Sequence, residues 1–429
     1  MYNDFIFFIN IYMEKLVVFG GQKLFGEVEL QVSKNAVLPI MSACLLNKDR
    51  VELTKLPNIT DVENMIKILS SLGVEIEKQN SGLTLDMKHA NLNEIDDALV
   101  KSMRSSVFLL GSMLGRFKQA TFSSPGGCRI GARPIDLHIK AFKKLGVRVC
   151  SLEDRLFFDA RGAHVGRIKL KIPSVGVTEN IIQFACLLKG ETEIINPAKE
   201  PEVVDLCNFL NSCGANIVGA GTNKITIYGV NSLHSAQYTP MPDRIVEGTI
   251  LLAVAMCGGE VKIKNACGNI NSSLIKKLVS MGCQICLKGD IIIVSSESGL
   301  KNLKKVCTGF YPDFATDLQS MFTALCSVSA GKTKIRERVF ENRFLIVDEL
   351  IKMGAKIKRI NRHTILVEGV EKLYPASLHA QELRGGAALV LAALMAEGKT
   401  EIGGVHFIDR GYEKIETTFS SLGAKIKRE

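Results

Sequence analysis

The 429-residue sequence contains no tryptophan, and aromatic residues make up only 6% of it. Long blocks of lysine or arginine are also absent, although the formal net charge is +10. Proteins that bind nucleic acid usually combine basic patches with aromatic side chains that stack on bases. The composition therefore disfavours a basic module for RNA, and the dispersed positive charge fits a small, strongly anionic substrate better.

No apolar run is long enough to cross a membrane. The apolar stretch at residues 5–13 is well short of the ~20 residues that a spanning helix needs. It has no positively charged segment before it and no small-residue cleavage site, so it does not resemble a signal peptide. We therefore expect a cytoplasmic protein that binds no membrane. Met13 is an alternative start, and residues 1–12 are expected to be disordered or untranslated.

The twelve cysteines form no metal-binding or disulfide framework. Only Cys283 and Cys286 make a C-x-x-C pair, within a segment that alternates like a strand, where residues three apart point to opposite faces. No second C-x-x-C or histidine pair accompanies them, so a zinc site is not expected. A phosphate-binding P-loop and a dinucleotide-binding G-x-G-x-x-G are also missing. We therefore expect neither a metal nor a cofactor.

Six segments share one pattern. Each has an apolar-periodic stretch, a glycine and then an alternating β-branched stretch, which is typical of a helix that ends at a glycine and leads into a strand. The glycines are 68 to 73 residues apart: Gly73, Gly146, Gly214, Gly282, Gly354 and Gly423. A polar turn and a second strand follow most of them. Such units are too long for a solenoid, so we predict two compact α/β domains of three units each, joined near residues 237–248.

Charged residues interrupt the hydrophobic periodicity mostly at junctions between an expected strand and the expected helix that follows it. Free N–H groups and the positive end of the helix dipole favour anions at such junctions. A single arginine or aspartate there is more often a helix cap than a catalytic residue. Five arginines in different repeats nevertheless occupy similar junctions: Arg104, Arg133, Arg343, Arg384 and Arg410. If these junctions converge, they form an arginine-lined cleft suited to phosphate and carboxylate.

One cysteine lies in a different kind of segment. Cys128 follows a Pro-Gly-Gly sequence and is flanked by Arg129 and Arg133. Nearby positive charge favours the thiolate, and adjacent glycines allow a loop to move. The pattern predicts a reactive thiol on a mobile loop that closes over a substrate.

Eight motifs, in chain order, resemble the family of UDP-N-acetylglucosamine enolpyruvyl transferases (1-carboxyvinyltransferases): KNAVLPI, PGGCRIGARPIDLH, PSVGVTENI, EPEVVDL, PDRIVEG, FATDLQ, VFENRF and FIDRGYEKIE. The resemblance covers nearly the whole chain. It implies two inside-out α/β domains, each of three repeated helix–strand units, with a substrate cleft between them. One domain would hold residues 1–33 and 242–429, with Asp317, and the other residues 34–241, with the Cys128 loop.

The resemblance implies transfer of the enolpyruvyl group of phosphoenolpyruvate to the 3′-hydroxyl of UDP-N-acetylglucosamine, with release of phosphate. The reaction is an addition–elimination through a tetrahedral intermediate. It is the first committed step of bacterial peptidoglycan synthesis, so cell-wall biogenesis, cell shape and cell division depend on it, and fosfomycin inhibits the family. The implied partners are these two small molecules, with no nucleic acid. The sequence leaves the oligomeric state open.

The resemblance also implies roles for individual residues. Cys128 would protonate C3 of phosphoenolpyruvate or bind it covalently, and the sequence leaves open which role dominates. Asp317 would take the hydroxyl proton, and Lys34, Arg133 and Arg410 would hold phosphoenolpyruvate. The other implied substrate-binding residues are Asn35, Arg104, Pro134, Asp136, Ser174, Val175, Gly176, Val339, Arg343 and Arg384.

Some positions depart from the family pattern. Val32-Ser33 stand where Gly-Ala is usual, Glu382 stands where Asp is usual, and Asp313 and Ala315 stand where Gly and Pro are usual. These changes bear on efficiency more than on identity. Two alternatives remain open: a weakly active or regulatory paralogue, and the shikimate-pathway enolpyruvyl transferase. The second has the same fold, but its pattern lacks the cysteine loop.

Overall fold

The computed structural model describes residues 14–79, 81–92, 95–123, 130–131, 135–152, 155–297 and 299–429. Contacts within the chain divide these residues into two compact units. The first unit holds residues 14–31, 130–131 and 242–429, and the second holds the remainder. The chain passes between the units after Gln31 and after Met241, and residues 130–131 are a further short segment that belongs to the first unit. Each unit has a separate hydrophobic core.

The first unit contains three sheets. The first sheet has the order β22 (Ser377–His379), β23 (Gly398–Gly403), β1 (Leu16–Gly20) and β24 (Lys425–Arg428). The second sheet has the order β15 (Gln284–Lys288), β16 (Ile291–Ser296), β14 (Gly259–Lys264) and β2 (Leu24–Glu29). The third sheet has the order β18 (Phe314–Ala315), β17 (Lys305–Gly309), β19 (Lys332–Arg336), β21 (Thr364–Glu368) and β20 (Lys356–Asn361).

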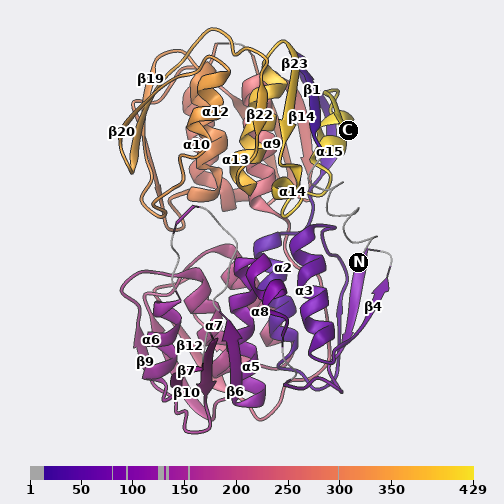
Figure 1. Cartoon of the computed structure of the whole chain (residues 1–429), viewed down its shortest axis with the longest axis vertical. Coiled ribbons are helices and arrows are strands. Elements are labelled where there is room, and N and C mark those ends of the chain that lie inside the picture. Colours follow the sequence, from indigo (N-terminus) through magenta and orange to yellow (C-terminus); the bar gives the residue numbers. More distant parts are fainter. Residues whose placement is uncertain are drawn as a thin grey trace. The chain divides into compact units, whose positions relative to one another are not determined.

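Helices fill the interior of this unit and strands surround them (Figure 1). In α13 (Leu383–Met395), which is rich in alanine, glycine and leucine, every residue except the last is buried. A helix that is apolar on all sides is buried on all sides. The other central helices are α9 (Arg244–Cys257) and α11 (Gln319–Val328), and the shorter ones are α10 (Ser272–Met281), α12 (Val347–Lys352), α14 (Val405–Ile408), α15 (Ile415–Ser421), η2 (Gly268–Asn271) and η3 (Thr316–Leu318).

The second unit repeats this plan with three sheets. They comprise β13 (Ala236–Tyr238), β3 (Arg50–Leu53), β5 (Gly82–Asp86) and β4 (Glu75–Gln79); β11 (Asn216–Val218), β12 (Lys224–Gly229), β10 (Gly190–Ile195) and β9 (Arg167–Lys169); and β6 (Gln119–Ser123), β8 (Arg155–Asp159) and β7 (Arg148–Leu152). The helices are α2 (Lys34–Cys44), α3 (Thr60–Ser71), α4 (Asp97–Ser102), α5 (Leu109–Phe117), α6 (Asp136–Lys144), α7 (Val175–Ala185), α8 (Pro201–Ser212) and η1 (Arg104–Phe108). The prediction of inside-out α/β units is confirmed.

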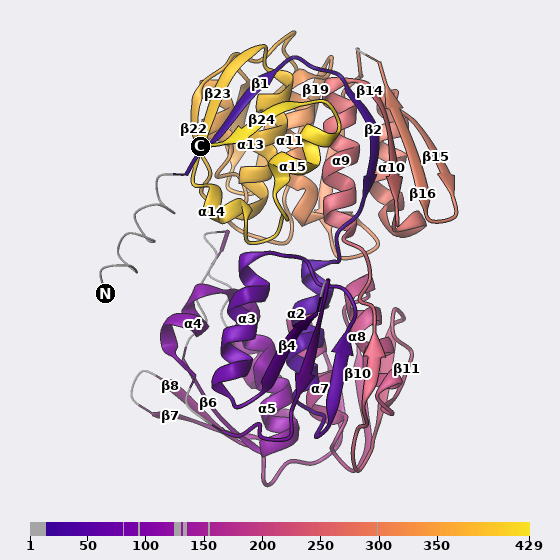
Figure 2. The same cartoon turned by 90° about the vertical axis from the view of Figure 1, so that its right-hand side faces the viewer.

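The six repeats are confirmed by their glycines. Each glycine at a predicted helix end has a positive φ, between 80° and 121°. Side chains rarely adopt this conformation, so glycine ends the helix and turns the chain into the strand. In the sixth repeat, β24 pairs antiparallel with β1. Strand β1 thus takes the place of the second hairpin strand that follows the glycine in the other repeats. The first and last strands therefore lie side by side (Figure 2).

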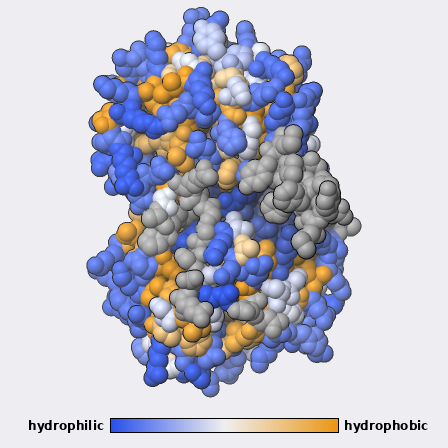
Figure 3. All heavy atoms as spheres, in the orientation of Figure 1, coloured by the Kyte–Doolittle hydropathy of each residue, from blue (hydrophilic) through white to orange (hydrophobic). Residues whose placement is uncertain are grey.

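Along each strand, side chains that face the core alternate with side chains that face solvent. In β19, for example, Thr333 and Ile335 are buried, and the three cations that flank them are exposed. On the face drawn in Figure 3, hydrophilic side chains predominate, and hydrophobic ones appear in smaller patches. Cys283 is buried and Cys286 is exposed, as the alternation predicted. Within the described residues, no helix combines the length and apolarity that a membrane span requires.

Hydrogen bonds within each unit hold the chain beside its crossings after Gln31 and after Met241. Asp243 donates its backbone N–H to the carbonyl of Gln31 over 2.9 Å, and Ser33 donates to the carbonyl of Met241 over 2.8 Å. The Asp205 carboxylate accepts from the N–H of Met241, 3.0 Å away, and from the Tyr238 hydroxyl, 2.6 Å away. The aspartate of the EPEVVDL motif therefore fixes the second crossing.

Helices α5 and α7 pack unusually closely, because Gly111 has no side chain. A Cβ atom at this position would lie only 2.5 Å from the backbone oxygen of Asn180. A buried chain of side-chain hydrogen bonds also joins α2, α5 and α7: Ser42 Oγ lies 3.0 Å from Ser112 Oγ and 3.0 Å from Gln183 Oε1. The three helices are thereby fixed against one another.

The change Gly111→Ala tests this close packing. We expect it to lower the free energy of unfolding by about 1–3 kcal/mol, because the added methyl group would push α5 away from α7. Thermal or denaturant unfolding measures the change. Gly162→Ala is the control, since a Cβ there meets nothing within 4 Å. Equal stability of the two variants would contradict the packing described.

Candidate active site

Asp317 lies in η3, directly before α11, and pairs with two arginines, Arg343 from its own repeat and Arg384 from the next one. Its Oδ1 is 2.7 Å from Nη2 of Arg343, in the loop before α12, and its Oδ2 is 3.1 Å from Nη2 of Arg384, in the first turn of α13. The arginine side chains are 2% and 4% exposed, whereas that of Asp317 is 26% exposed. The carboxylate is therefore the accessible member of a largely buried ionic cluster.

The charges of this cluster decide the protonation of Asp317. Burial by itself would raise the pKa of Asp317, but the neighbouring charges of Arg384 and Arg343 outweigh it and hold the pKa far below its ordinary value of 3.8. Burial by itself would lower the pKa of Arg384, but the charge of Asp317 raises it by more, so the pKa of Arg384 lies above its ordinary value. Asp317 is consequently ionised at neutral pH.

Glu382 determines where α13 begins. Its carboxylate accepts hydrogen bonds from the backbone N–H of Arg384, at 2.8 Å, and from that of Gly385. This is the hydrogen-bonding pattern of a helix N-cap, and it places negative charge at the positive end of the helix dipole. The longer side chain at this position thus orients the turn that carries Arg384, and its Oε2 lies 4.0 Å from Nη1 of Arg343.

Glu337 is a positioning residue that the sequence did not reveal. It is buried, and its carboxylate accepts from the hydroxyls of Thr308 (2.9 Å) and Thr316 (3.0 Å) and from the N–H groups of Val339 (2.8 Å) and Phe340 (3.2 Å). It therefore ties the loop of Val339 to the residue before Asp317. In the sequence, Glu337 follows alternating charges that are typical of a solvent-exposed strand. Its position directly after the strand was the one signal that it belongs to a junction like those of the predicted site residues.

Arg410 lies between α14 and α15, in a segment that two distant residues hold. Arg428 in β24 binds the carboxylate of Asp409 through Nη1 (2.8 Å) and Nη2 (2.7 Å). Gln31 donates to the carbonyl of Gly411 over 3.1 Å and accepts from the N–H of Glu413 over 2.9 Å. Neither Arg428 nor Gln31 was predicted to bear on the site, because nothing in the sequence links either residue to Arg410.

In the second unit, Lys34 and Asn35 begin α2. Lys34 Nζ lies 2.8 Å from Oδ2 of Asp61, and the two side chains are 11% and 1% exposed. The carboxylate of Asp61 compensates the nearly buried ammonium group. Ser33 has extended backbone angles (φ −66°, ψ 119°), and Val32 has no positive φ, so the β-branched residue fits this crossing without strain.

Asn180 joins the segments that carry the remaining predicted residues of the second unit. Its Oδ1 accepts from the N–H of Gly111 over 2.6 Å, and its Nδ2 lies 3.1 Å from the carbonyl of Val107 and 3.0 Å from Nδ1 of His138. These bonds connect η1, which begins at Arg104, and α6, which begins at Asp136, to α7. Asn180 belongs to the PSVGVTENI motif, but its role in joining these helices was not predicted.

The predicted residues thus fall into two groups. In the first unit the structure brings Asp317, Arg343 and Arg384 into contact, with Val339 tied to them through Glu337. In the second unit the predicted residues lie at helix starts: Lys34, Asn35, Arg104, Asp136, Ser174, Val175 and Gly176. Cys128, Arg133 and Pro134 lie outside the described residues. Beyond Cys128, the carbonyl of Ile130 accepts from the N–H of Asn342, 2.8 Å away, within the first unit.

Comparisons with known proteins agree with this arrangement. A family profile described as EPSP synthase (3-phosphoshikimate 1-carboxyvinyltransferase) matches residues 18–419. The enolpyruvyl transferase NikO from Streptomyces tendae superposes with a TM-score of 0.87 at 23% identity, over 97% of this chain and 98% of its own. EPSP synthase from Acinetobacter baumannii gives 0.73 at 16% identity, over 97% and 100%. The fold is therefore that of the enolpyruvyl transferases.

Two curated relatives are more similar in sequence. UDP-N-acetylglucosamine 1-carboxyvinyltransferase 2 of Caldanaerobacter subterraneus and UDP-N-acetylglucosamine 1-carboxyvinyltransferase of Clostridium botulinum are each 44% identical, over 97% of this chain and 100% of their own length. The chain belongs to the 1-carboxyvinyltransferase family. The family and the enzyme class predicted from the motifs are confirmed.

Glu179, in the middle of α7, is a buried carboxyl group outside these clusters. Within the described chain neither of its oxygens has a hydrogen-bond partner. Burial, reinforced by the charges of Glu202 and Glu200, raises the pKa of Glu179 well above its ordinary 4.5. The folded protein therefore holds a proton here that the unfolded chain releases as the pH rises above that value.

Glu179→Gln tests this assignment. The contribution of Glu179 to the free energy of unfolding should fall as the pH rises above 4.5, by at most about 1.4 kcal/mol per pH unit between the unfolded and folded pKa values. Glutamine needs no proton. The free energy of unfolding of the variant should therefore rise relative to that of the wild type as the pH approaches neutrality, and this difference should disappear below pH 4.5. Denaturant unfolding at both pH values measures the difference. The exposed Glu371→Gln should show no such dependence, and a pH-independent effect of Glu179→Gln would refute the assignment.

Proposed function

We propose that the protein transfers the enolpyruvyl group of phosphoenolpyruvate to the 3′-hydroxyl of UDP-N-acetylglucosamine and releases phosphate. The observation that carries this proposal is the cluster of Asp317 with Arg343 and Arg384, which combines an ionised carboxylate with buried guanidinium groups. Relatives named for this activity are 41–44% identical over nearly the full chain. Both substrates are charged and do not cross a membrane unaided, which supports a cytoplasmic location.

The residues suit the two steps of the reaction. In the addition, the sugar oxygen bonds to C2 of phosphoenolpyruvate, its proton passes to Asp317, and C3 takes a proton from Cys128. In the elimination, the C2–O bond to phosphate breaks, the Cys128 thiolate takes a proton back from C3, and the double bond returns. Lys34 and Arg410 bind the phosphate and carboxylate of phosphoenolpyruvate, as cations that pair with such groups do.

The ionic cluster has a consequence for the base. A carboxylate held by two guanidinium groups is a weak proton acceptor. An anionic substrate that pairs with Arg343 or Arg384 competes with Asp317 for their charge and makes Asp317 more basic. The base is therefore strengthened when substrate arrives.

The shikimate-pathway alternative is not favoured. The family profile bears that name, but the EPSP synthase structure is only 16% identical to this chain. Phosphate release with phosphoenolpyruvate should be supported by UDP-N-acetylglucosamine and not by shikimate 3-phosphate. A preference for shikimate 3-phosphate would overturn the assignment, and no release with either acceptor would favour a non-catalytic paralogue.

Cys128→Ala tests the proposed thiol. General acid catalysis contributes about 10²–10⁴-fold, so turnover should fall by that order, and inactivation by the epoxide fosfomycin should disappear. The exposed cysteines Cys150 and Cys286 supply the control, since their alanine variants should keep both properties. Undiminished turnover in Cys128→Ala would remove this thiol from the mechanism.

Asp317→Asn tests the proposed base. Asparagine preserves the shape of the side chain but cannot take a proton, so kcat should fall about 10²–10⁴-fold. Steady-state kinetics measures the change, and Asp290→Asn, at an exposed position between β15 and β16, should leave kcat unchanged. If Asp317→Asn kept more than about a tenth of kcat, proton transfer to this carboxylate would be excluded.

A further inference from the structure

The outward face of the third sheet in the first unit is strongly basic. Strands β17 and β19 run parallel in a register that places Lys305 opposite Lys334 and Cys307 opposite Arg336. The antiparallel neighbour β21 places Thr364 opposite Arg336. Because side chains alternate along a strand, all these residues face the same side of the sheet.

The inward face of the same strands is apolar. Val306, Ile335 and Ile365 are at most 1% exposed and belong to the core of the unit. The alternation therefore assigns every second residue to solvent, but it does not require those residues to be cations. Further lysines extend the basic face on β19 and β20: Lys332, Lys356 and Lys358.

The arrangement of these charges costs stability. Like charges directly opposite one another on neighbouring strands repel, as the Lys305 and Lys334 side chains do. Among the described residues, the carboxylate on this face is that of Glu368, and it pairs with Lys332 over 3.1 Å. Within that part of the chain, no carboxylate lies within ion-pair distance of Lys305, Lys334 or Arg336. An anion between them would relieve the repulsion.

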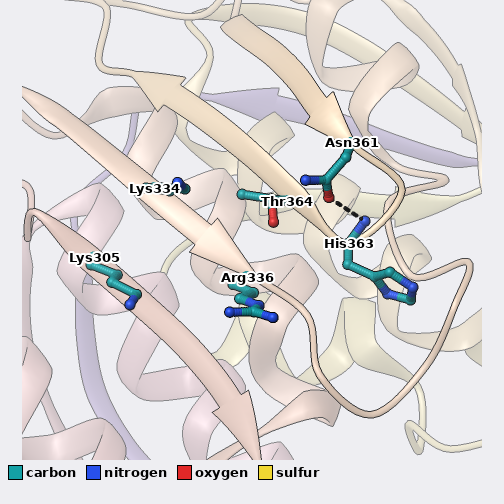
Figure 4. Close-up of a pocket in the computed structure, with 6 residues that line it drawn as sticks. All are labelled: Lys305, Lys334, Arg336, Asn361, His363 and Thr364. Carbon is teal, nitrogen blue, oxygen red and sulfur yellow. Dashed lines mark hydrogen bonds between the residues drawn. The ribbon is translucent and has the colours of Figure 1, made fainter.

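A cavity of about 420 Å³ lies among these cations (Figure 4). This volume is in the usual range for small-molecule sites, about 300–1,000 Å³. Strands β17, β19, β20 and β21 and the turn between the last two supply its lining, which consists of Lys305, Lys334, Arg336, Asn361, His363 and Thr364. None of these residues belongs to the candidate active site.

The polar side chains of the cavity supplement the charge. Asn361 accepts a hydrogen bond from the backbone N–H of His363 through Oδ1, over 3.0 Å, which fixes the amide so that its NH₂ group remains as a donor (Figure 4). Thr364 contributes a hydroxyl and His363 a ring N–H. The cavity thus offers cations and neutral donors, which is the set that binds phosphate oxygens.

We propose that this cavity binds a small anion that carries two or more phosphate groups. Neighbouring strands lie ~4.8 Å apart and alternate residues along a strand ~6.7 Å apart, so the three cations are too widely spread for one phosphate to bind them equally. A nucleic acid strand fits less well, because among the described residues that line the cavity only His363 has an aromatic ring on which a base could stack. The inference is independent of the function proposed above.

Calorimetric titration with inorganic triphosphate at physiological salt tests the proposal. The double variant Lys334→Gln/Arg336→Gln should bind triphosphate at least about tenfold more weakly than the wild type, since it loses two charge-assisted contacts. Inorganic phosphate should bind the wild type at least about tenfold more weakly than triphosphate. Triphosphate should also raise the melting temperature of the wild type more than that of the double variant.

The matched control is Lys356→Gln/Lys358→Gln, which removes the same charge from the same sheet outside the cavity. It should change triphosphate affinity by less than about threefold. Anion binding at the active site appears equally in all three proteins and cancels in the comparison. Equal losses in the two double variants would show a diffuse basic surface and overturn the proposal. So would the absence of any triphosphate binding that depends on Lys334 and Arg336, or tighter binding of a single-stranded RNA than of triphosphate.

Discussion

The requirement that buried charge be paired governs the first unit. Arg343 and Arg384 are almost completely buried, and a buried guanidinium group without a partner costs several kcal/mol. Asp317 supplies the compensating charge to both, so the three segments that carry these residues must meet. Each segment comes from a different part of the repeat pattern: a short helix after β18, a loop after β19 and the start of α13. The meeting point is where the proposed chemistry needs an ionised carboxylate beside cations.

The inside-out repeats make this convergence possible. Helices that are apolar on all sides lie inside, and their amino ends carry polar residues at the edge of the core. Buried hydrogen bonds, from Ser42 to Gln183 and from Asn180 to His138, fix the helices so that these ends cannot drift. The sheets take the outer positions, so their second faces meet solvent. The third sheet uses that face for the cations around its cavity.

Much of this was predictable from the sequence. Helix-capping glycines, which require a positive φ, recur at a fixed spacing and revealed three repeats in each unit, and junction arginines pointed to an anion site. The supporting carboxylates were harder to predict. Glu337 accepts from the hydroxyls of Thr308 and Thr316, which only the folded chain brings near, and Gln31 and Arg428 act on a segment close to Arg410. Glu382 caps N–H groups close to it in sequence, but its distance to Arg343 depends on the fold. Local patterns carry propensity and periodicity, but they do not specify which distant groups meet.

The central claim is that two arginines hold Asp317 ionised and thereby set its strength as a base. The most direct test is the infrared carboxyl signal of Asp317, isolated as the difference between the wild type and Asp317→Asn in the folded, substrate-free protein. At pH 3.8 an ordinary aspartyl carboxyl group is half protonated. We predict a fully ionised carboxylate at that pH. A signal that is half or more protonated would contradict it.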